Sequence, residues 1–421
     1  MAQKLKFGNG TWATKKGSTL SYNDEGGNFK PLPFTTTRNS IATRVNKEGL
    51  IEVVGNDVPR IDYTDSADGV LLLENSATNL ITQSQAFDNS YWTKTGSSVT
   101  SGFISPDGTN NSFKLVENSS SGTHLITKSQ QSHNNSYSVF AKKGEKKWIL
   151  LTSHSTSAPT ARGQFFDLEN GIVGEGGNAN GKIEDYGNGW YRCSTEPNAA
   201  SSLFTVMLAD GDGVFSYQGN GADGVYIWGA QNTDTDLSSY IPTNGSTVQR
   251  AAETANGAGN SEVFNDSEGV LFAEINLIYN QSGRYITLGD GTSSNRIILG
   301  TEGGDDRIIF YVIVGGNVQC QIPYILPDIN AIYKIAIKYK QNDFALWVNG
   351  LEVGTDTSGS TLASNALSKL VFNGGTGTSN FYGKTKELGY YNTALTDAEL
   401  EYMTSYRSLN ELVTELNLNE L

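Results

Sequence analysis

The chain has 421 residues, more than one ordinary hydrophobic core accommodates, so its length predicts two or three domains. Glycine is abundant at 47 residues, proline is scarce at 9, and only 18% of the residues are charged, a composition typical of short strands joined by tight turns. The formal net charge of −14 argues against a nucleic-acid or anionic-membrane partner. We therefore expect an all-β protein that binds no nucleic acid and does not insert into a membrane.

The first 75 residues are rich in turns, and up to about residue 67 no run has enough apolar side chains to close a core. We therefore expect residues 1–75 to form an extended arm that docks on a neighbouring subunit or a larger assembly. Within this arm, residues 42–54 have the pattern of a β-hairpin that turns at Glu48 and Gly49.

Residues 76–250 show the alternation of apolar and polar side chains that is typical of strands, and the strands recur at short intervals. This spacing predicts a β-sandwich or jelly roll. Residues 251–267 are small and polar and are expected to be a linker. The predicted strands of the first sandwich are residues 112–116, 137–141, 148–151, 164–168, 190–194, 203–208 and 225–229.

Residues 268–396 repeat the strand pattern and predict a second sandwich, in which Asn349-Gly350 makes a tight hairpin turn. The pattern then changes, because Thr396 and Glu399 form a capping box that starts a helix, which we expect over residues 397–421. This helix is expected to pack on its own sandwich, although self-association through its short apolar stripe is an alternative.

Three stretches resemble known families. The first hundred residues resemble bacteriophage virion proteins of the head-fibre or tail-fibre type, which implies a virion-surface location, an arm that joins other virion proteins and a homo-oligomer. The block from residue 79 is similar to jelly-roll carbohydrate-binding modules, and the C-terminal block resembles concanavalin A-like, laminin G-like domains. These resemblances rest on residues 7–34 (FGNGTWATKKGSTLSYNDEGGNFKPLPF), 42–63 and 69–81, then on 79–81, 87–88, 91–92 and 223–227, and finally on 347–350, 383–388 and 391–400.

No catalytic constellation is found in the sequence. Glycoside hydrolases on the second fold often carry a Glu-x-Asp-x-x-Glu strand, and the nearest segment here, residues 274–279, lacks two of its three carboxylates. His124, His133 and His154 lack metal-ligand spacing and are expected at the surface or in turns. Cys193 and Cys320 lie far apart, so each is expected to be a buried thiol. We therefore expect a protein that is not an enzyme and has no catalytic residues.

Candidate ligand-binding residues fall into two groups. Sugar stacking needs exposed aromatic faces, for which the candidates are Trp92, Trp148 and Trp347, although core packing is the alternative for each. Structural Ca²⁺ needs oxygen ligands on loops, although turn formation alone also explains such aspartates. The calcium candidates are Asp210, Asp212, Asp305 and Asp306 in acidic turns, and Glu74 and Asp107 by resemblance to the jelly-roll modules.

Together these observations predict a non-enzymatic phage virion protein for surface display and host attachment, binding cell-surface or environmental glycans. Two alternatives stay open at this point. One is a purely structural capsid-decoration or fibre protein without a ligand, and the other is a glycan depolymerase.

Overall fold

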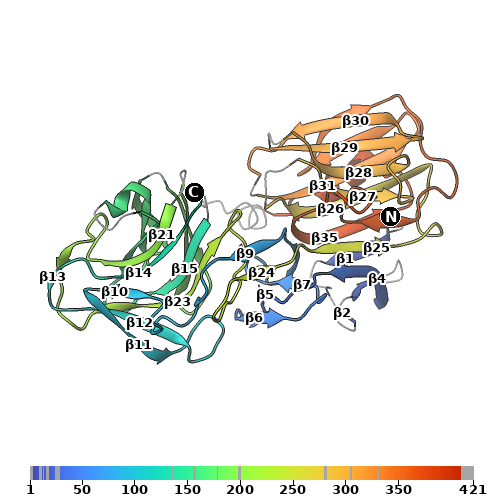
Figure 1. The fold of residues 1–421 in the computed structure, drawn as a ribbon. Helices are drawn as coiled ribbons and strands as arrows, with labels where there is room; N and C mark the ends of the chain where they lie inside the picture. The colour runs from blue at the N-terminus through green and yellow to red at the C-terminus, as the bar shows by residue number, and fades with distance from the viewer. Residues whose placement is uncertain are drawn as a thin grey trace. The chain divides into compact units, whose positions relative to one another are not determined.

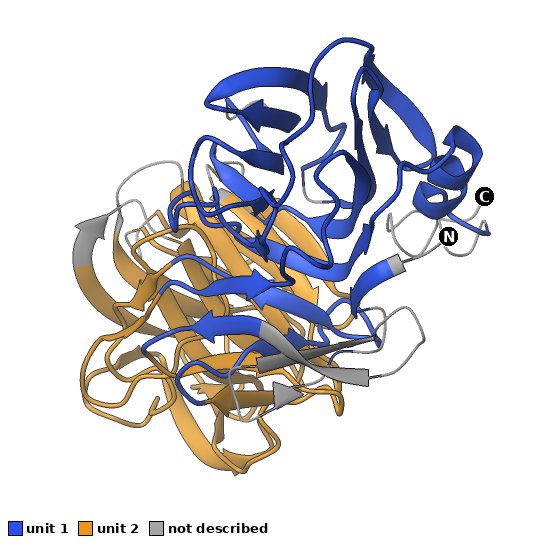
Figure 2. Cartoon of the chain, turned by 90° about the vertical axis from the view of Figure 1, so that its right-hand side faces the viewer, with its two compact units in different colours: residues 1–39, 55–75, 252–421 blue, residues 40–54, 76–251 orange. Residues whose placement is uncertain are grey.

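The computed structural model describes residues 3–8, 12, 14–15, 19–23, 29–133, 136–154, 158–177, 179–197, 201–278, 282–303, 306–329 and 331–408. The chain forms two compact units (Figure 2). Unit 1 comprises residues 1–39, 55–75 and 252–421, and unit 2 comprises residues 40–54 and 76–251. The chain therefore passes from one unit to the other four times, after residues 39, 54, 75 and 251.

Unit 2 is a sandwich of two antiparallel sheets (Figure 1). Side chains from both sheets meet in one core, which includes Ile126, Ile149 and Phe204 from one sheet and Val139 and Ile227 from the other. The first sheet has the order β10 (Thr93–Thr95), β14 (Leu125–His133), β21 (Ser201–Ala209), β16 (Trp148–Thr152), β17 (Gly163–Asp167) and β18 (Ile172–Gly176). The second has the order β11 (Ser97–Phe103), β12 (Ser112–Glu117), β23 (Gly224–Thr233), β15 (Ser136–Lys142), β20 (Trp190–Pro197) and β19 (Ala179–Asp185). Strand β9 (Ala77–Asn79) also pairs with β23, and β24 (Val248–Arg250) pairs with β9.

Smaller elements complete unit 2. A hairpin of β5 (Ala42–Val45) and β6 (Ile51–Val54) confirms the hairpin predicted at residues 42–54. Its Val45 and Ile51 pack in one buried cluster with Phe140, Trp190 and Trp228 from the second sheet and with Tyr240 from the segment after β23. The remaining elements are β13 (Ser121–Gly122), β22 (Tyr217–Gln218) and the 3-10 helix η1 (Pro159–Arg162).

Unit 1 is a second sandwich, whose strands are hydrogen-bonded into one continuous sheet. One run has the order β33 (Leu351–Asp356), β32 (Phe344–Val348), β31 (Ile332–Lys340), β26 (Glu268–Asn276) and β35 (Gly383–Tyr391), and β35 also pairs with β1 (Gln3–Gly8) and β8 (Val70–Leu73). The other run has the order β30 (Asn317–Ile325), β29 (Arg307–Val314), β28 (Arg296–Thr301), β27 (Arg284–Gly289), β34 (Lys369–Val371), β25 (Thr254–Ala258), β4 (Phe29–Thr37), β3 (Thr19–Asn23) and β2 (Thr14–Lys15). Strand β7 (Arg60–Asp62) pairs with β8.

The core of unit 1 lies between these two runs. It includes Leu271 and Ile337 from the first run and Ile286, Leu299 and Phe310 from the second. With the sandwich of unit 2, it confirms the predicted all-β fold class of two sandwiches.

The structure distributes residues 1–75 between the two units, where we had expected an extended arm. Strand β1 pairs with β35, β4 pairs with β25, and residues 40–54 belong to unit 2. Residues 251–267, expected as a linker, contain β25, which pairs with both β4 and β34. The physical reason is that strands far away in the sequence supply the backbone partners and apolar surface that these segments lack locally.

Helix α1 (Asp397–Thr404) starts where the capping box predicts. The Thr396 side chain accepts a hydrogen bond from the Glu399 backbone nitrogen, and the Glu399 side chain accepts one from the Thr396 nitrogen. The helix is shorter than the expected span of 397–421, because Ser405 is extended and ends it, and residues 409–421 lie outside the described residues. Leu395 and Leu400 pack with Trp347 on its own sandwich. Among the described residues, no helix has the length and hydrophobicity that a membrane crossing requires.

Candidate functional site

Two of the three tryptophans predicted to stack on sugars are buried. Trp92 is only 2% exposed, lies in the core of unit 2, and donates a hydrogen bond from Nε1 to the Gln83 carbonyl at 3.0 Å. Trp347 is 6% exposed and lies under the segment that ends in helix α1. Because a buried indole presents no face to a ligand, neither residue offers a stacking surface in this structure.

The third predicted residue, Trp148, is half-buried on the outer face of the first sheet of unit 2. It pairs with Ala209 of β21 and Asp167 of β17, while its neighbour Ile149 points into the core. The glycine at position 174 lets two side chains converge, since a Cβ atom there would lie 2.7 Å from Trp148 Cζ3 and 2.4 Å from Asp212 Oδ1. The fold thus brings Trp148 beside one of the predicted calcium candidates.

Trp148 is the centre of an exposed patch. Ile172 of β18 is 55% exposed. It lies in the same cross-strand row as Trp148 of β16, because both residues pair with Asp167 of the intervening strand β17. Phe215 and Trp148 both pack against the buried cluster on this face of the sheet, and the preceding Val214 is 44% exposed. We call Trp148, Ile172, Gly174, Asp212, Val214 and Phe215 the Trp148 surface. It combines an aromatic ring with a carboxylate, the two groups that a neutral sugar uses for stacking and for hydroxyl hydrogen bonds.

The predicted calcium candidates do not converge on one site. Asp210 receives a hydrogen bond from Lys146 Nζ at 2.5 Å, and Asp212 Oδ1 receives one from the Glu175 nitrogen at 2.8 Å. Asp306 lies in the turn before β29 with a φ of 54°, and Asp305 lies outside the described residues. Glu74 forms an ion pair with Arg60 at 2.8 Å. In the described part of the chain, no three His, Cys, Asp or Glu side chains are arranged to hold a metal ion.

Asp107 is held by its own turn. Its carboxylate accepts hydrogen bonds from Ser105 Oγ at 2.6 Å, from Thr109 Oγ1 at 2.7 Å and from Asn111 Nδ2 at 3.1 Å. Burial alone would raise the pKa of Asp107, but these hydrogen bonds outweigh it and lower the pKa below its ordinary value. The residue therefore stays ionised and fixes the turn before β12.

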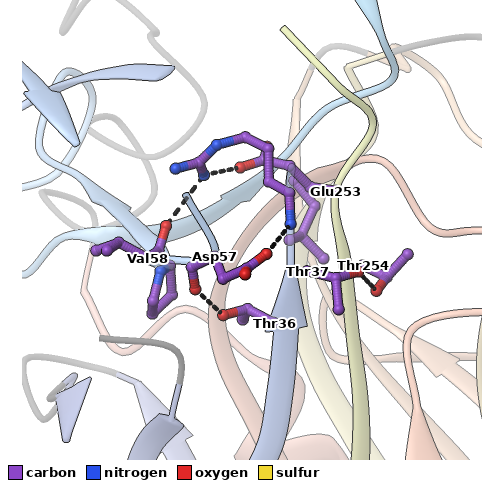
Figure 3. Close-up of a pocket in the computed structure, with 9 residues that line it drawn as sticks. Thr36, Thr37, Asp57, Val58, Glu253 and Thr254 are labelled. Atoms are coloured by element: carbon purple, nitrogen blue, oxygen red, sulfur yellow. Dashed lines mark hydrogen bonds and ion pairs between the residues drawn. The ribbon is translucent and has the colours of Figure 1, made fainter. Parts of the chain in front are cut away.

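A pocket in unit 1 is lined by Glu253 (Figure 3) and Arg38. These two residues belong to a buried charge cluster that also contains Arg60 and Glu74. Arg38 Nη1 lies 2.7 Å from Glu253 Oε1, and Arg60 Nε lies 2.9 Å from the same oxygen. Burial would lower the pKa of Arg60, but Glu253 and Glu74 raise it above its ordinary value. Since both arginines are neutralised, we interpret this cluster as structural.

The charge cluster sits where the chain enters and leaves unit 1. Arg38 precedes the first passage into unit 2 and Glu74 precedes the third, while Glu253 follows the last return. Arg38 also donates to the carbonyls of Gly55 and Val58, just after the second passage, at 2.5 and 3.0 Å. The cluster therefore ties together all four segments that connect the units, within unit 1.

A second exposed face, missed in the sequence, lies on the second run of unit 1. Ile286 and Phe310 point into the core, so Tyr285 and Tyr311 point outward. The Tyr285 ring lies across Gly300, where an added Cβ atom would be 2.2 Å from Tyr285 Cδ1. The alternation of buried and outward residues along β27 and β29 is the sequence signal that identifies these two tyrosines as outward-facing.

Polar groups border these tyrosines. Tyr311 donates a hydrogen bond to Glu302 Oε1 at 2.6 Å, and burial followed by this bond raises the pKa of Tyr311 to about 12. Arg307 lies 3.7 Å from Glu302. We call Tyr285, Arg296, Gly300, Glu302, Arg307 and Tyr311 the tyrosine face. This face offers the flat Tyr285 ring, which lies over the backbone of Gly300, and hydrogen-bond donors and acceptors surround the ring.

Other predicted residues are placed as follows. His124 is fully buried, with Nδ1 2.7 Å from the Gly96 carbonyl oxygen, so the expectation of a surface position was wrong for this residue. The His124 ring also packs against the Tyr217 ring. His154 is half-buried, and the side chain of His133 is not described. Cys193 and Cys320 are buried free thiols, as predicted, and burial raises the pKa of both.

The tyrosine face lies within a segment that matches a known family. Residues 260–401 match the laminin G model described as the concanavalin A-like lectin/glucanases superfamily. This match covers the C-terminal sandwich that the sequence predicted to resemble such domains. The comparison with curated proteins found no match.

Several solved structures are similar to parts of the chain at low identity. The CBM40 of the Ruminococcus gnavus IT-sialidase is 15% identical, and the match covers 36% of this chain and 94% of the CBM40 chain with a TM-score of 0.30. Domain 4 of AbnA, a GH43 arabinanase from Geobacillus stearothermophilus in complex with arabinotriose, is 13% identical, with coverages of 41% and 83% and a TM-score of 0.30. Domains LG4-5 of the mouse laminin alpha1 chain are 10% identical, with coverages of 85% and 96% and a TM-score of 0.24. These similarities are too low to assign a ligand to this chain.

Proposed function

We propose that this chain is a non-enzymatic carbohydrate-binding protein. The observation that carries the proposal is the Tyr285 ring laid across Gly300 on an outward face of the segment that matches the lectin superfamily. A sugar ring presents a face of C–H groups that stacks on an aromatic ring, and its hydroxyls need nearby polar partners. Tyr285 supplies the ring, and Glu302 and Arg296 supply the polar groups.

The Trp148 surface supports the same function in unit 2. Its indole ring and the Asp212 carboxylate lie on either side of Gly174. A carboxylate accepts hydrogen bonds from sugar hydroxyls, and the exposed Ile172 beside it extends the apolar area. Each unit therefore carries one surface with the chemistry of glycan recognition.

Binding without hydrolysis is supported by the composition of the tyrosine face. Glycoside hydrolysis usually requires two carboxyl groups, about 5 to 9.5 Å apart across the bond that is cleaved. The tyrosine face contains one, Glu302, and this group already contacts Tyr311 and Arg307. A depolymerase would release reducing ends from a polysaccharide, and we expect none on incubation with capsule or β-glucan.

We further propose that the protein is displayed on a phage virion, where it serves adhesion as part of an oligomer. The support is the resemblance of residues 7–34, 42–63 and 69–81 to head-fibre and tail-fibre proteins. Deleting the first strands would remove β1 and β4 from the sheets of unit 1, so truncation is a poor test. Immunogold labelling of intact particles tests the location directly, and unlabelled particles would contradict it.

The test of glycan binding uses the full chain on an array of glycans. Removing a stacked aromatic ring at the centre of a binding surface should weaken affinity about tenfold or more, about 1.4 kcal/mol. We therefore expect that weakening for Tyr285→Ala with glycans held by unit 1, and for Trp148→Ala with those held by unit 2. Tyr402→Ala is the matched control, because Tyr402 is 60% exposed on helix α1, which packs on the first run of unit 1 and belongs to neither surface. An array without any binding would contradict the proposal.

A further inference from the structure

Strand β11 is a free edge of the second sheet of unit 2 (Figure 1). It pairs with β12 on one side, and among the described residues no backbone hydrogen bond joins its other side. Ser98, Thr100 and Ser101 are exposed, and a Cβ atom added to Gly102 would meet no heavy atom within 4 Å. The chain therefore leaves this strand open to a partner.

The peptide groups of Ser97, Val99 and Ser101 point toward the free edge. The Asn118 nitrogen donates to the Gly96 carbonyl at 2.8 Å across the ladder of β11 and β12, so the even-numbered residues of β11 bond to β12. In an antiparallel ladder, the residues between them direct both backbone groups to the opposite side. The N–H and carbonyl groups of these three residues are thus presented to another strand.

Strand β11 lacks the protection that the other long edges have. In the described part of the chain, every other edge strand of at least five residues contains a charged residue or a proline, which discourage pairing with a foreign strand. These residues include Glu175 in β18, Lys182 in β19, Pro323 in β30 and Glu352 in β33. Residues 97–103 (SSVTSGF) contain neither, so two copies can meet there without opposing like charges, although each chain carries a formal charge of −14.

A second copy fits this edge in an antiparallel register centred on Val99. In that register Ser97 lies opposite Ser101 of the second copy, and Val99 lies opposite its own counterpart, so outward-directed peptide groups meet at every one of these positions. The register ends before the irregularity between Ser101 and Phe103. The Val99 side chain already packs against the core of unit 2, so paired valines would continue that core across the junction.

We propose that two copies of this chain associate by pairing their β11 strands into one continuous sheet. The twofold axis passes at Val99, as a contact between identical surfaces requires. Because the contact consists of a single pair of strands, the dimer should dissociate on dilution. The inference uses no residue of either glycan-binding surface, and it goes beyond the oligomer proposed above by naming the contact.

The first experiment measures the mass of the full chain by sedimentation velocity over a range of concentrations. We expect the mass of two 45.4-kDa chains at high concentration. Ser101→Pro removes an N–H group that points to the partner but none that bonds to β12, and should weaken dimerisation about tenfold or more.

Thr100→Glu should weaken dimerisation by a similar factor, because it places like charges on adjacent strands of the dimer. Within its own sheet the new carboxylate would face Lys114, so this variant keeps the test decisive if Ser101→Pro does not fold. Thr355→Glu is the matched control, because Thr355 is also exposed on an edge strand, β33 of unit 1, and dimerisation should be unchanged.

Disulfide trapping tests the register. Ser98 of one copy lies opposite Thr100 of the other in a pair without mutual hydrogen bonds, where Cα atoms are about 4.5 Å apart, within the range that a disulfide spans. Identical positions lie about 7–8 Å apart on the diagonal, which is too far. An oxidised mixture of Ser98→Cys and Thr100→Cys chains should therefore give several-fold more covalent dimer than either variant alone. Cys193 and Cys320 are buried and do not compete.

The outcomes separate this contact from glycan binding. A chain that is monomeric at every concentration would overturn the contact and leave glycan binding intact, and the edge would then be left for an extended segment of another protein. A dimer that tolerates both Ser101→Pro and Thr100→Glu, or that Thr355→Glu weakens equally, would also overturn it. Equal trapping of each cysteine variant alone would overturn the register. An array without binding would contradict only the glycan function.

Discussion

Replacing Glu253 by glutamine should destabilise unit 1 by about 3–5 kcal/mol, the usual cost of breaking a buried ion pair by removing one partner. Glu253 is 3% exposed, and its two oxygens accept hydrogen bonds from Arg38, from two nitrogens of Arg60 and from the Glu74 backbone nitrogen. Arg38 and Arg60 are 2% and 0% exposed, so water cannot replace the lost carboxylate.

The magnitude follows from the charge of the cluster. Arg38, Arg60, Glu74 and Glu253 sum to zero, and the glutamine variant leaves one buried positive charge. Its amide group also places donors where the wild-type oxygens meet the Arg60 and Glu74 nitrogens. The four hydrogen bonds that the charged carboxylate accepts, at about 1.5–3 kcal/mol each, bound the loss from above, because the remaining amide oxygen still accepts some of them. The estimate of about 3–5 kcal/mol lies within that bound.

Equilibrium urea unfolding, followed by far-UV circular dichroism, measures this change as a lower midpoint at unchanged slope. Glu268→Gln is the matched control, because Glu268 pairs with Lys340 at a half-exposed edge, and we expect a change within about 0.5 kcal/mol. A Glu253→Gln variant that unfolds at the wild-type urea concentration would refute the reasoning. It would show that the buried charges contribute no net stability.

Two further predictions concern stability. Asp107 has a pKa lowered in the folded state, so its contribution is present above about pH 4, the unfolded value, and is lost as pH falls through the folded pKa. The stability advantage of the wild type over Asp107→Asn should therefore be constant at neutral pH and shrink below about pH 4 in urea titrations; an advantage independent of pH would contradict this. Thr396→Ala removes the capping box of helix α1 and should cost about 1 kcal/mol in thermal unfolding, whereas Thr393→Ala, at an exposed position before the helix, should cost less.

Features set by neighbours in the sequence were predictable. Asn349 and Gly350 adopt φ angles of 49° and 85°, which Asn-Gly accommodates with little strain. This dipeptide alone therefore predicted the hairpin between β32 and β33. The capping box of Thr396 and Glu399 depends on residues three apart and was confirmed. Strand alternation likewise identified the two sandwiches.

Features set by distant partners were not predictable. Strand β4 pairs with β25 more than 200 residues later, and Arg38 meets Glu253 across 215 residues. Nothing local distinguishes such segments from a polar arm or a linker. For the candidate site, alternation placed Trp148 on a sheet, but its nearness to Asp212 depends on how a distant turn returns to Gly174. Trp347 also points away from the main core of unit 1 and is buried in a separate cluster that includes Leu395 and Leu400, about fifty residues later in the sequence.

The division of unit 2 into residues 40–54 and 76–251 constrains how such a chain can exchange parts by recombination. A donor fragment covering only 76–251 would arrive without Val45 and Ile51, leaving the aromatic cluster around Phe140 and Trp228 uncovered by its hairpin. A recipient that kept its own residues 40–54 would need a hairpin matched to the incoming aromatic face. A transferred unit 2 must therefore carry both of its segments, residues 40–54 and 76–251, to keep this cluster covered.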